Sequence, residues 1–266
     1  MFSSRLHWDL RPNPLAQLLA TKQRQGTPIL DLTESNPTRA GFAYPNEALV
    51  EALAQPEALL YEPSPAGLVR AREAVAGYYR ARGISMDPER IILTASTSEA
   101  YAYLFKLLAE PGDEILVPRP SYPLFEYLAA LESARPVPYP LRYHGSWSLD
   151  VAALAAAITA RTRALVLVNP NNPTGSFVKR GELEQLIPIG KEANLAIISD
   201  EVFADYTFAP DRNRVETLVS EDRVLTFCLS GLSKIAGLPQ MKLGWIVLAG
   251  SLALQESARA RLTRSK

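Results

Sequence analysis

One stretch of sequence indicates the fold before any other: Val224-Leu225-Thr226-Phe227-Cys228-Leu229-Ser230-Gly231-Leu232-Ser233-Lys234. Its first six residues are typical of a buried strand, so Lys234 lies just beyond a strand end. Two apolar runs upstream end in the same way, one at Asp200 and the other shortly before Asn172. Ligands of open α/β sheets bind at the carboxyl ends of the strands. We therefore expect Lys234, Asp200 and Asn172 to share one site.

Apolar runs alternate with helical periodicity along the sequence from residue 91 onward. This repeated strand and helix order predicts an α/β fold of three layers (αβα), with a mostly parallel central sheet covered on both faces. The expected strands span residues 91–93, 114–117, 164–168, 195–199, 224–229 and 243–248. The expected helices span residues 15–24, 46–58, 67–82, 98–109, 124–131, 151–160, 182–193 and 251–264, and a further strand-like run spans 29–32.

Composition excludes several classes of function. The 266 residues carry 28 basic and 28 acidic side chains, so no net field favours nucleic acid or an anionic membrane. Cys228 is the single cysteine, which rules out an internal disulfide. His7 and His144 lie in irregular polar stretches, and we expect no metal site. Without a signal peptide or a long apolar run, the expected location is the cytoplasm.

A lysine and a carboxylate at one sheet edge suit pyridoxal 5'-phosphate. This cofactor needs an amine for a Schiff base and an anion beside its pyridinium nitrogen. Lys234 would supply the amine and Asp200 the anion, which keeps the ring nitrogen protonated. The Asn172 amide would donate to the phenolic oxygen. Two of these residues also have a plainer interpretation, since Asp200 suits a helix N-cap and Asn172 lies in an Asn-Pro turn.

Three further segments would complete such a site. Thr97 and Ser98 open a predicted helix, where N–H groups and hydroxyls bind a phosphate, although a simple helix cap is equally compatible. Lys242 would add positive charge beside the same anion. Tyr122 would stack its ring on the pyridine, with core packing as the alternative.

These segments resemble, in order, the class I/II aminotransferases of the fold-type I pyridoxal phosphate-dependent family. The resemblance covers residues 29–250 and rests on Tyr61 with residues 67–70, and on residues 111–114, 118–123, 171–175, 200–203 and 233–245. It implies a mixed central sheet and a homodimer with shared active sites. It also implies that Ser233 joins the phosphate site and that Tyr61 reaches the phosphate of the neighbouring subunit.

The sequence departs from the family pattern at three places. Phe203 stands where a tyrosine commonly donates to the phenolic oxygen, so the pKa of the imine is expected to be higher. Lys242 stands where arginine is common. A lysine ammonium acts as a point charge, whereas an arginine guanidinium can make two parallel hydrogen bonds to a phosphate. The C-terminal small domain, which holds the arginine that binds the substrate carboxylate, is expected to be missing.

The resemblance implies three segments and one enzymatic activity. Residues 1–45 would form an N-terminal arm and small-domain segment, 46–250 the large cofactor-binding domain, and 251–266 the truncated start of an interdomain helix. The implied activity moves an amino group between an L-amino acid and a 2-oxo acid. Two alternatives stay open, a pyridoxal phosphate-dependent C–S β-lyase and an inactive cofactor-binding fragment.

Overall fold

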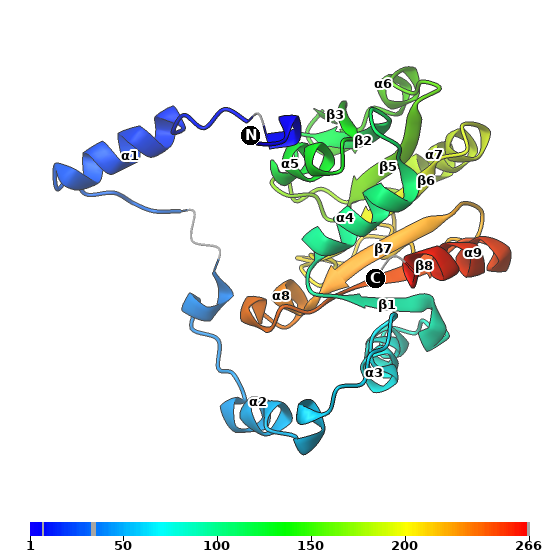
Figure 1. The fold of residues 1–266 in the computed structure, drawn as a ribbon. Coiled ribbons are helices and arrows are strands. Elements are labelled where there is room, and N and C mark those ends of the chain that lie inside the picture. Colours follow the sequence, from blue (N-terminus) through cyan, green and yellow to red (C-terminus); the bar gives the residue numbers. More distant parts are fainter. Residues whose placement is uncertain (7, 33–35, 265–266) are drawn as a thin grey trace.

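The computed structural model describes residues 1–6, 8–32 and 36–264, and its centre is an eight-stranded sheet (Figure 1). The strand order is β1-β8-β7-β6-β5-β2-β3-β4. The strands are β1 (Ile91–Thr94), β2 (Glu114–Arg119), β3 (Arg135–Tyr143), β4 (Trp147–Leu149), β5 (Thr162–Val168), β6 (Ala196–Asp200), β7 (Thr226–Gly231) and β8 (Gly244–Ala249). His7, which the sequence analysis placed in an irregular stretch, lies outside the described residues.

The central strands are parallel and the outer pairs are antiparallel. Parallel pairing joins β3, β2, β5, β6 and β7 in that order, whereas β8 is antiparallel to both β7 and β1. The carboxyl ends of β2, β5, β6 and β7 therefore meet at one edge of the sheet. The expected mixed, mostly parallel sheet is confirmed.

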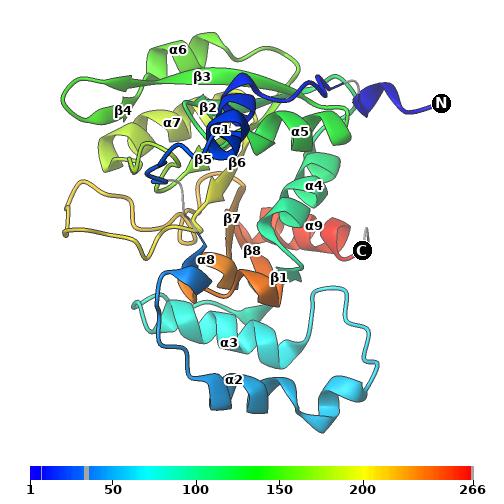
Figure 2. The same ribbon diagram turned by 90° about the vertical axis from the view of Figure 1, so that its left-hand side faces the viewer.

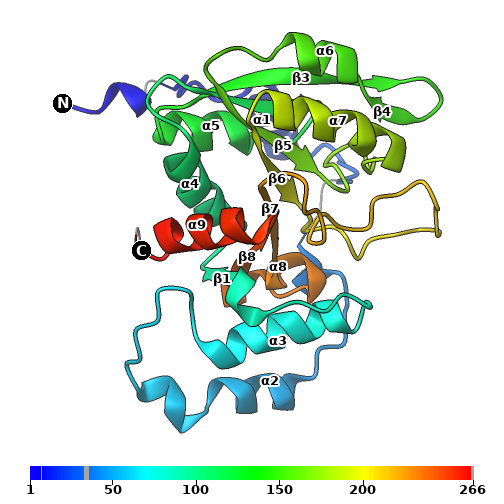
Figure 3. The ribbon, with the colours of Figure 1, turned by 90° about the vertical axis from the view of Figure 1, so that its right-hand side faces the viewer.

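Helices cover both faces of the sheet and complete three layers (Figures 2 and 3). One apolar core contains buried side chains of α4 (Thr97–Leu108), α5 (Leu124–Leu131) and α9 (Leu252–Leu262). The core on the other face contains those of α3 (Val69–Arg80), α6 (Val151–Ala156) and α7 (Arg180–Glu192). The one-turn α8 (Leu232–Ile235) follows β7. The described residues also form short 3-10 helices at Ser4–Leu6, Pro37–Arg39, Pro56–Leu59, Pro88–Arg90 and Pro239–Met241.

The sequence analysis missed β3, because Pro136, Pro138 and Pro140 argue against a strand. Residues two apart in a strand point their N–H groups to the same side. The N–H of Arg135 donates to the carbonyl oxygen of Asp113, the residue before β2, so the alternate prolines face away from β2. Over residues 135–140 that side carries no ladder partner, because β4 pairs only with the last three residues of β3. The prolines lack a backbone N–H group, but no ladder hydrogen bond is lost because that side of the strand is unpaired.

The N-terminal segment contributes nothing to either core. Among its described residues none is buried before Ala66, and α1 (Pro14–Arg24) stands away from the sheet in Figure 1. Residues 29–32, expected to be strand-like, form no strand, and Leu30 and Leu32 are more than four fifths exposed. The helix α2 (Asn46–Leu53) also has no buried residue. The division at residues 45 and 250 stays a prediction.

Two glycines bring three segments together beside the end of β7. Gly231 pairs with Gly244, and a Cβ atom at Gly231 would lie 2.7 Å from the carbonyl oxygen of Leu243. A Cβ atom at Gly244 would lie 3.2 Å from the backbone nitrogen of Thr97, at the start of α4. Side chains at these positions would separate β7, β8 and α4. The glycines thus hold the start of α4 close to the segment that carries Lys234.

We expect Gly231→Ala to lower the free energy of unfolding by about 1–3 kcal/mol, because its methyl group meets backbone atoms that cannot rotate away. Gly77→Ala is the control: Gly77 lies inside α3 with no atom within 4 Å of an added Cβ. It should stabilise the protein by up to about 1 kcal/mol through helix propensity. Urea unfolding curves measure both changes, and equal effects would contradict the close approach at Gly231.

Candidate functional site

A cavity of about 340 Å³ opens at the carboxyl edge of the sheet. Eight of the ten predicted site residues line it, and they come from five separate parts of the chain. The eight are Thr97, Ser98, Tyr122, Asn172, Asp200, Phe203, Ser233 and Lys234. The sequence prediction that these residues lie together agrees with this geometry, whereas their individual roles stay predictions.

Lys234 lies in α8, three residues after the end of β7. Its Nζ atom lies 5.6 Å from the centre of the Phe203 ring, within the range of a cation–π contact. The Tyr206 hydroxyl donates to the carbonyl oxygen of Lys234 at 3.0 Å, and the Tyr206 ring packs edge-on against Phe203. The lysine segment is therefore fastened to the loop that follows β6.

Asp200 is the last residue of β6, opposite Leu229 of β7. Its Oδ2 accepts a hydrogen bond from the Tyr101 hydroxyl at 2.9 Å, and its Oδ1 accepts from the N–H of Val202 at 3.2 Å. Burial raises the pKa of Asp200 above its ordinary value, and these two hydrogen bonds and the charge of Lys234 oppose that rise. The site thus holds a desolvated carboxylate close to an amine.

Glu201, the next residue, points to the other face of the sheet. Its carboxylate accepts from the hydroxyls of Ser199 and Thr217 and from the N–H of Leu218. Burial raises the pKa of Glu201, and the hydrogen bonds from Thr217, Leu218 and Ser199 oppose this rise. These bonds tie β6 to the segment around residue 217, so the role of Glu201 is structural.

The start of α4 is capped and lies beside the cavity. Ser96 caps the helix, because its hydroxyl oxygen accepts from the N–H of Glu99 at 3.1 Å. Glu99 in turn accepts from the N–H of Ala95, the residue before the cap, at 2.6 Å. A helix leaves its first N–H groups without helical partners, so those of Thr97 and Ser98 are available at the cavity. The cap is therefore Ser96, a residue the sequence analysis did not single out.

Asn171, also missed, joins the two loops that carry Tyr122 and Asn172. Its amide nitrogen donates to the carbonyl of Pro120 at 3.1 Å and to Thr174 at 2.8 Å, and its oxygen accepts from Ser121 at 3.0 Å. Asn171 is only 5% exposed. Since these bonds link the loops after β2 and β5, they fix the spacing between Tyr122 and Asn172. The run of Asn and Pro around it was the available signal, but it indicated only a turn.

Two predicted site residues do not line the cavity. Lys242 is exposed and precedes Leu243, which does line it. Tyr61 is 90% exposed, in the part of the chain that precedes the core. The predicted contact of Tyr61 with a neighbouring subunit is untested within one chain.

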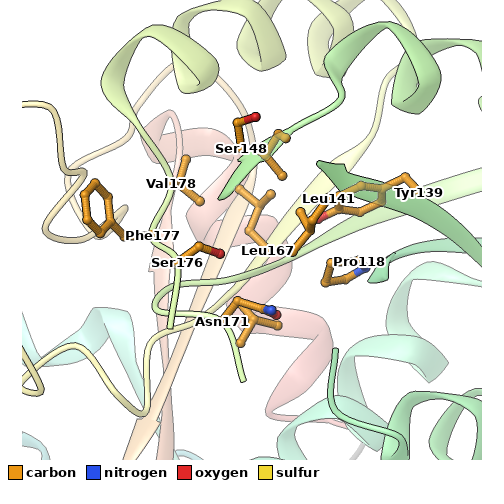
Figure 4. A pocket seen from close by; sticks show the side chains of 11 residues that line it. Pro118, Tyr139, Leu141, Ser148, Leu167, Asn171, Ser176, Phe177 and Val178 are labelled. Atoms are coloured by element: carbon orange, nitrogen blue, oxygen red, sulfur yellow. The ribbon is translucent and has the colours of Figure 1, made fainter. Parts of the chain in front are cut away.

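Figure 4 shows a smaller pocket, lined by Asn171, Ser148, Ser176 and mainly apolar side chains. Its volume of about 20 Å³ suffices for a water molecule but not for an aromatic ring. The larger cavity beside Lys234 is therefore the candidate site. The described part of the chain holds no cluster of His, Cys, Asp and Glu arranged to bind a metal ion.

The sequence matches the model of the family "Aminotransferase class I and II" over residues 27–262. The chain belongs to this family. It is 33% identical over 245 residues to the glutamate-pyruvate aminotransferase AlaA of Escherichia coli K12, and 31% identical over 240 residues to an alanine aminotransferase of Mycobacterium bovis. These alignments cover 91% and 89% of this chain, and 60% and 56% of the two relatives.

Solved structures of aminotransferases share the fold. The alanine aminotransferase of Pyrococcus furiosus superposes with a TM-score of 0.84 at 28% identity, covering all of this chain and 68% of that one. An aminotransferase from Escherichia coli gives a TM-score of 0.83 at 30% identity and is covered to 66%. The chain thus spans about three fifths of the length of the curated relatives it matches.

Members of this family depend on pyridoxal phosphate, and the cavity fits that group. It combines an amine, a half-buried carboxylate and a capped helix start, which are the three groups that its aldehyde, ring nitrogen and phosphate require. No helix within residues 1–6, 8–32 and 36–264 has the length and apolarity needed to cross a membrane.

We expect Asp200→Asn to stabilise the cofactor-free protein at neutral pH. The folded state binds the Asp200 proton more tightly than the unfolded state, so its contribution to stability falls as pH rises from about 3.8 through the raised pKa. The free energy of unfolding of the variant should therefore increase relative to that of the wild type as pH rises.

Asp113→Asn serves as the control of opposite sign, because Arg163 lowers the pKa of Asp113. Its carboxylate contributes stability above the unfolded pKa, and this is lost as pH falls through the lowered value. Asp113→Asn should destabilise the protein at neutral pH. Urea unfolding at several pH values gives both trends. A loss of stability in Asp200→Asn at neutral pH would show that burial is not the dominant effect on this carboxyl.

Proposed function

We propose that this protein is a pyridoxal phosphate-dependent aminotransferase that moves an amino group between an L-amino acid and a 2-oxo acid. One observation carries the proposal: Lys234, Asp200 and the start of α4 border the same cavity of about 340 Å³. Family membership supports the same reaction. Pyridoxal phosphate, when bound, supplies an aldehyde that condenses with amines and a ring that accepts electrons released at the substrate Cα.

The start of α4 is the proposed phosphate site. The N–H groups of Thr97 and Ser98 carry the positive end of the helix dipole, and the hydroxyls of Thr97, Ser98 and Ser233 add donors. Lys242, next to the cavity-lining Leu243, is proposed to add charge at longer range. A dianionic group held in this way fixes one end of the cofactor and leaves the opposite end to Asp200.

Lys234 is the proposed general base and acid. Its amine takes the proton from Cα of the amino acid and returns it to the cofactor carbon that receives the amino group. The cation–π contact with Phe203 keeps the amine on the cavity side of α8. Asp200 holds a proton on the ring nitrogen, because an opposite charge favours the protonated form. Asn172 is proposed to donate to the phenolic oxygen, and Tyr122 to cover one ring face.

The substrate is proposed to enter from a neighbouring hollow of about 500 Å³. This hollow shares Asn172 and Phe203 with the cavity and is also lined by Phe177, Tyr206 and Phe208. Two relatives are named alanine and glutamate-pyruvate aminotransferases, so alanine with 2-oxoglutarate and glutamate with pyruvate are the first pairs to test.

We further propose that two copies of the chain form a homodimer in the cytoplasm. Large apolar side chains before Ala66 lie exposed in the single chain, among them Leu30, Leu59 and Tyr61. A second copy would cover such a surface, and Tyr61 would then reach the phosphate of the neighbouring site. Cys228 is buried and unpaired, which suits a reducing compartment.

The function is tested by mixing the protein with pyridoxal phosphate and single amino acids, then recording the absorption spectrum and the 2-oxo acid formed. An aminotransferase converts the cofactor to its pyridoxamine form and releases a 2-oxo acid in equal amount. Lys234→Ala should lower the rate by at least about 100-fold, because it removes the general base. Lys191→Ala, on the exposed surface of α7, is the lysine control and should leave the rate unchanged.

The same assay separates the alternatives. Release of pyruvate, ammonia and sulfide from cysteine, without the pyridoxamine form, would identify a C–S β-lyase instead. A cofactor spectrum that no amino acid changes would identify an inert cofactor-binding chain. Either result would overturn the proposed reaction.

A further inference from the structure

Tyr101 is the only described side chain whose hydroxyl donates to Asp200. It reaches the carboxylate from α4, whereas the second donor, the N–H of Val202, follows β6 directly. The two bonds engage different oxygens of the carboxylate, at 2.9 Å and 3.2 Å. Together they fix the rotation of the carboxyl group, because each oxygen is held from a different direction.

The ring of Tyr101 is itself held rigidly. Tyr101 is 3% exposed, and its ring packs edge-on against Phe125 with centroids 5.3 Å apart and at a tilt against Phe105 at 5.7 Å. These contacts come from α5 and from the next turn of α4. The position of the hydroxyl is therefore set by the apolar core and not by Asp200 alone.

Burial also fixes the protonation state of this donor. The pKa of Tyr101 is raised well above its ordinary value, first by desolvation and then by the nearby charge of Asp200. Tyr101 is therefore a neutral donor at neutral pH. An O–H donor favours the ionised form of its carboxylate partner.

We propose that Tyr101 is a positioning residue for Asp200, holding its carboxylate ionised and oriented into the cavity so that it can pair with a protonated ring nitrogen. This inference deepens the proposed function and rests on it for the ring nitrogen, but the effect on Asp200 exists in the cofactor-free protein. The remaining groups that act on this pair are Lys234, whose charge also favours the carboxylate, and Tyr139, which affects Tyr101.

Tyr101→Phe tests the proposal because it keeps the ring and its packing and removes only the donor. The matched control is Tyr139→Phe: Tyr139 is equally buried and donates one hydrogen bond, to the carbonyl of Val166 at 2.8 Å. Both variants lose one buried hydrogen bond, so a general loss of stability affects them alike. Only Tyr101→Phe removes a bond to Asp200.

The first measurement is the titration of Asp200 in the cofactor-free protein, followed by NMR of carbon-13-labelled aspartate carboxyls. The signal is assigned by its absence in Asp200→Asn. We expect the pKa of Asp200 to rise by about one unit or more in Tyr101→Phe, since hydrogen bonds to charged groups are stronger than neutral ones. We expect no shift in Tyr139→Phe.

The second measurement is the pH dependence of pyridoxal phosphate binding. Tyr101→Phe should move its acidic midpoint upward by the same amount as the pKa of Asp200, while Tyr139→Phe should leave the midpoint where it is in the wild type. An unchanged pKa of Asp200 in Tyr101→Phe, or an equal shift in both variants, would overturn the proposal. If the wild type bound no pyridoxal phosphate, the proposed function would fail, whereas the titration would still decide the role of Tyr101.

Discussion

The parallel pairing of β6 with β7 is the constraint on which the site depends. Because the two strands run in the same direction, Asp200 at the end of β6 and Lys234 just beyond β7 emerge at one edge of the sheet. The neighbouring strands β5 and β2 add Asn172 and Tyr122 at the same edge. If β6 and β7 were antiparallel, the amine and the carboxylate would lie at opposite ends of the sheet.

The antiparallel strand β8 sets the other side of the cavity. Its pairing with β7 runs up to Gly231 opposite Gly244, and these two glycines allow α4 to begin close to the lysine segment. The helix start therefore meets the amine and carboxylate at a fixed separation. Electrostatics at this edge then favour an anion at α4 and a cation beside Asp200, which are the two charged ends of one cofactor.

Stability and function make opposite demands on Asp200. Burial raises the pKa of Asp200 and so opposes its ionisation. The hydrogen bonds from Tyr101 and Val202 and the charge of Lys234 lower the pKa and offset part of this rise. A carboxylate in open solvent would be easier to ionise, but it would attract a ring nitrogen far more weakly. Carboxyls with a shifted pKa are common in functional sites for this reason.

The sequence was sufficient to predict the layers of the fold and to single out eight residues that border one cavity. Strand ends are visible as apolar runs followed by Asp, Asn or Lys, and parallel order then brings those ends together. It was insufficient for β3, because alternate prolines are tolerated only on an unpaired edge, which no local pattern reveals. The strand expected at residues 29–32 was wrong, since apolar residues form a strand only beside a partner.

Long-range contacts explain what else escaped prediction. Tyr101 lies on the apolar stripe of α4 and is indistinguishable in sequence from a packing residue, although it meets Asp200 from 99 positions away. The role of Asn171 likewise depends on its hydrogen bonds with Pro120 and Ser121, on a loop about 50 residues upstream. Both depend on which loops the sheet places side by side.

The central claim is that the Lys234 amine faces the cofactor cavity. Its most direct test is to incubate the protein with pyridoxal phosphate, reduce it with borohydride and locate the modified lysine by peptide mass spectrometry. We expect one cofactor to be fixed to the peptide that contains Lys234. Modification at Lys179, Lys191 or Lys242 in place of Lys234, or no stoichiometric modification, would contradict it.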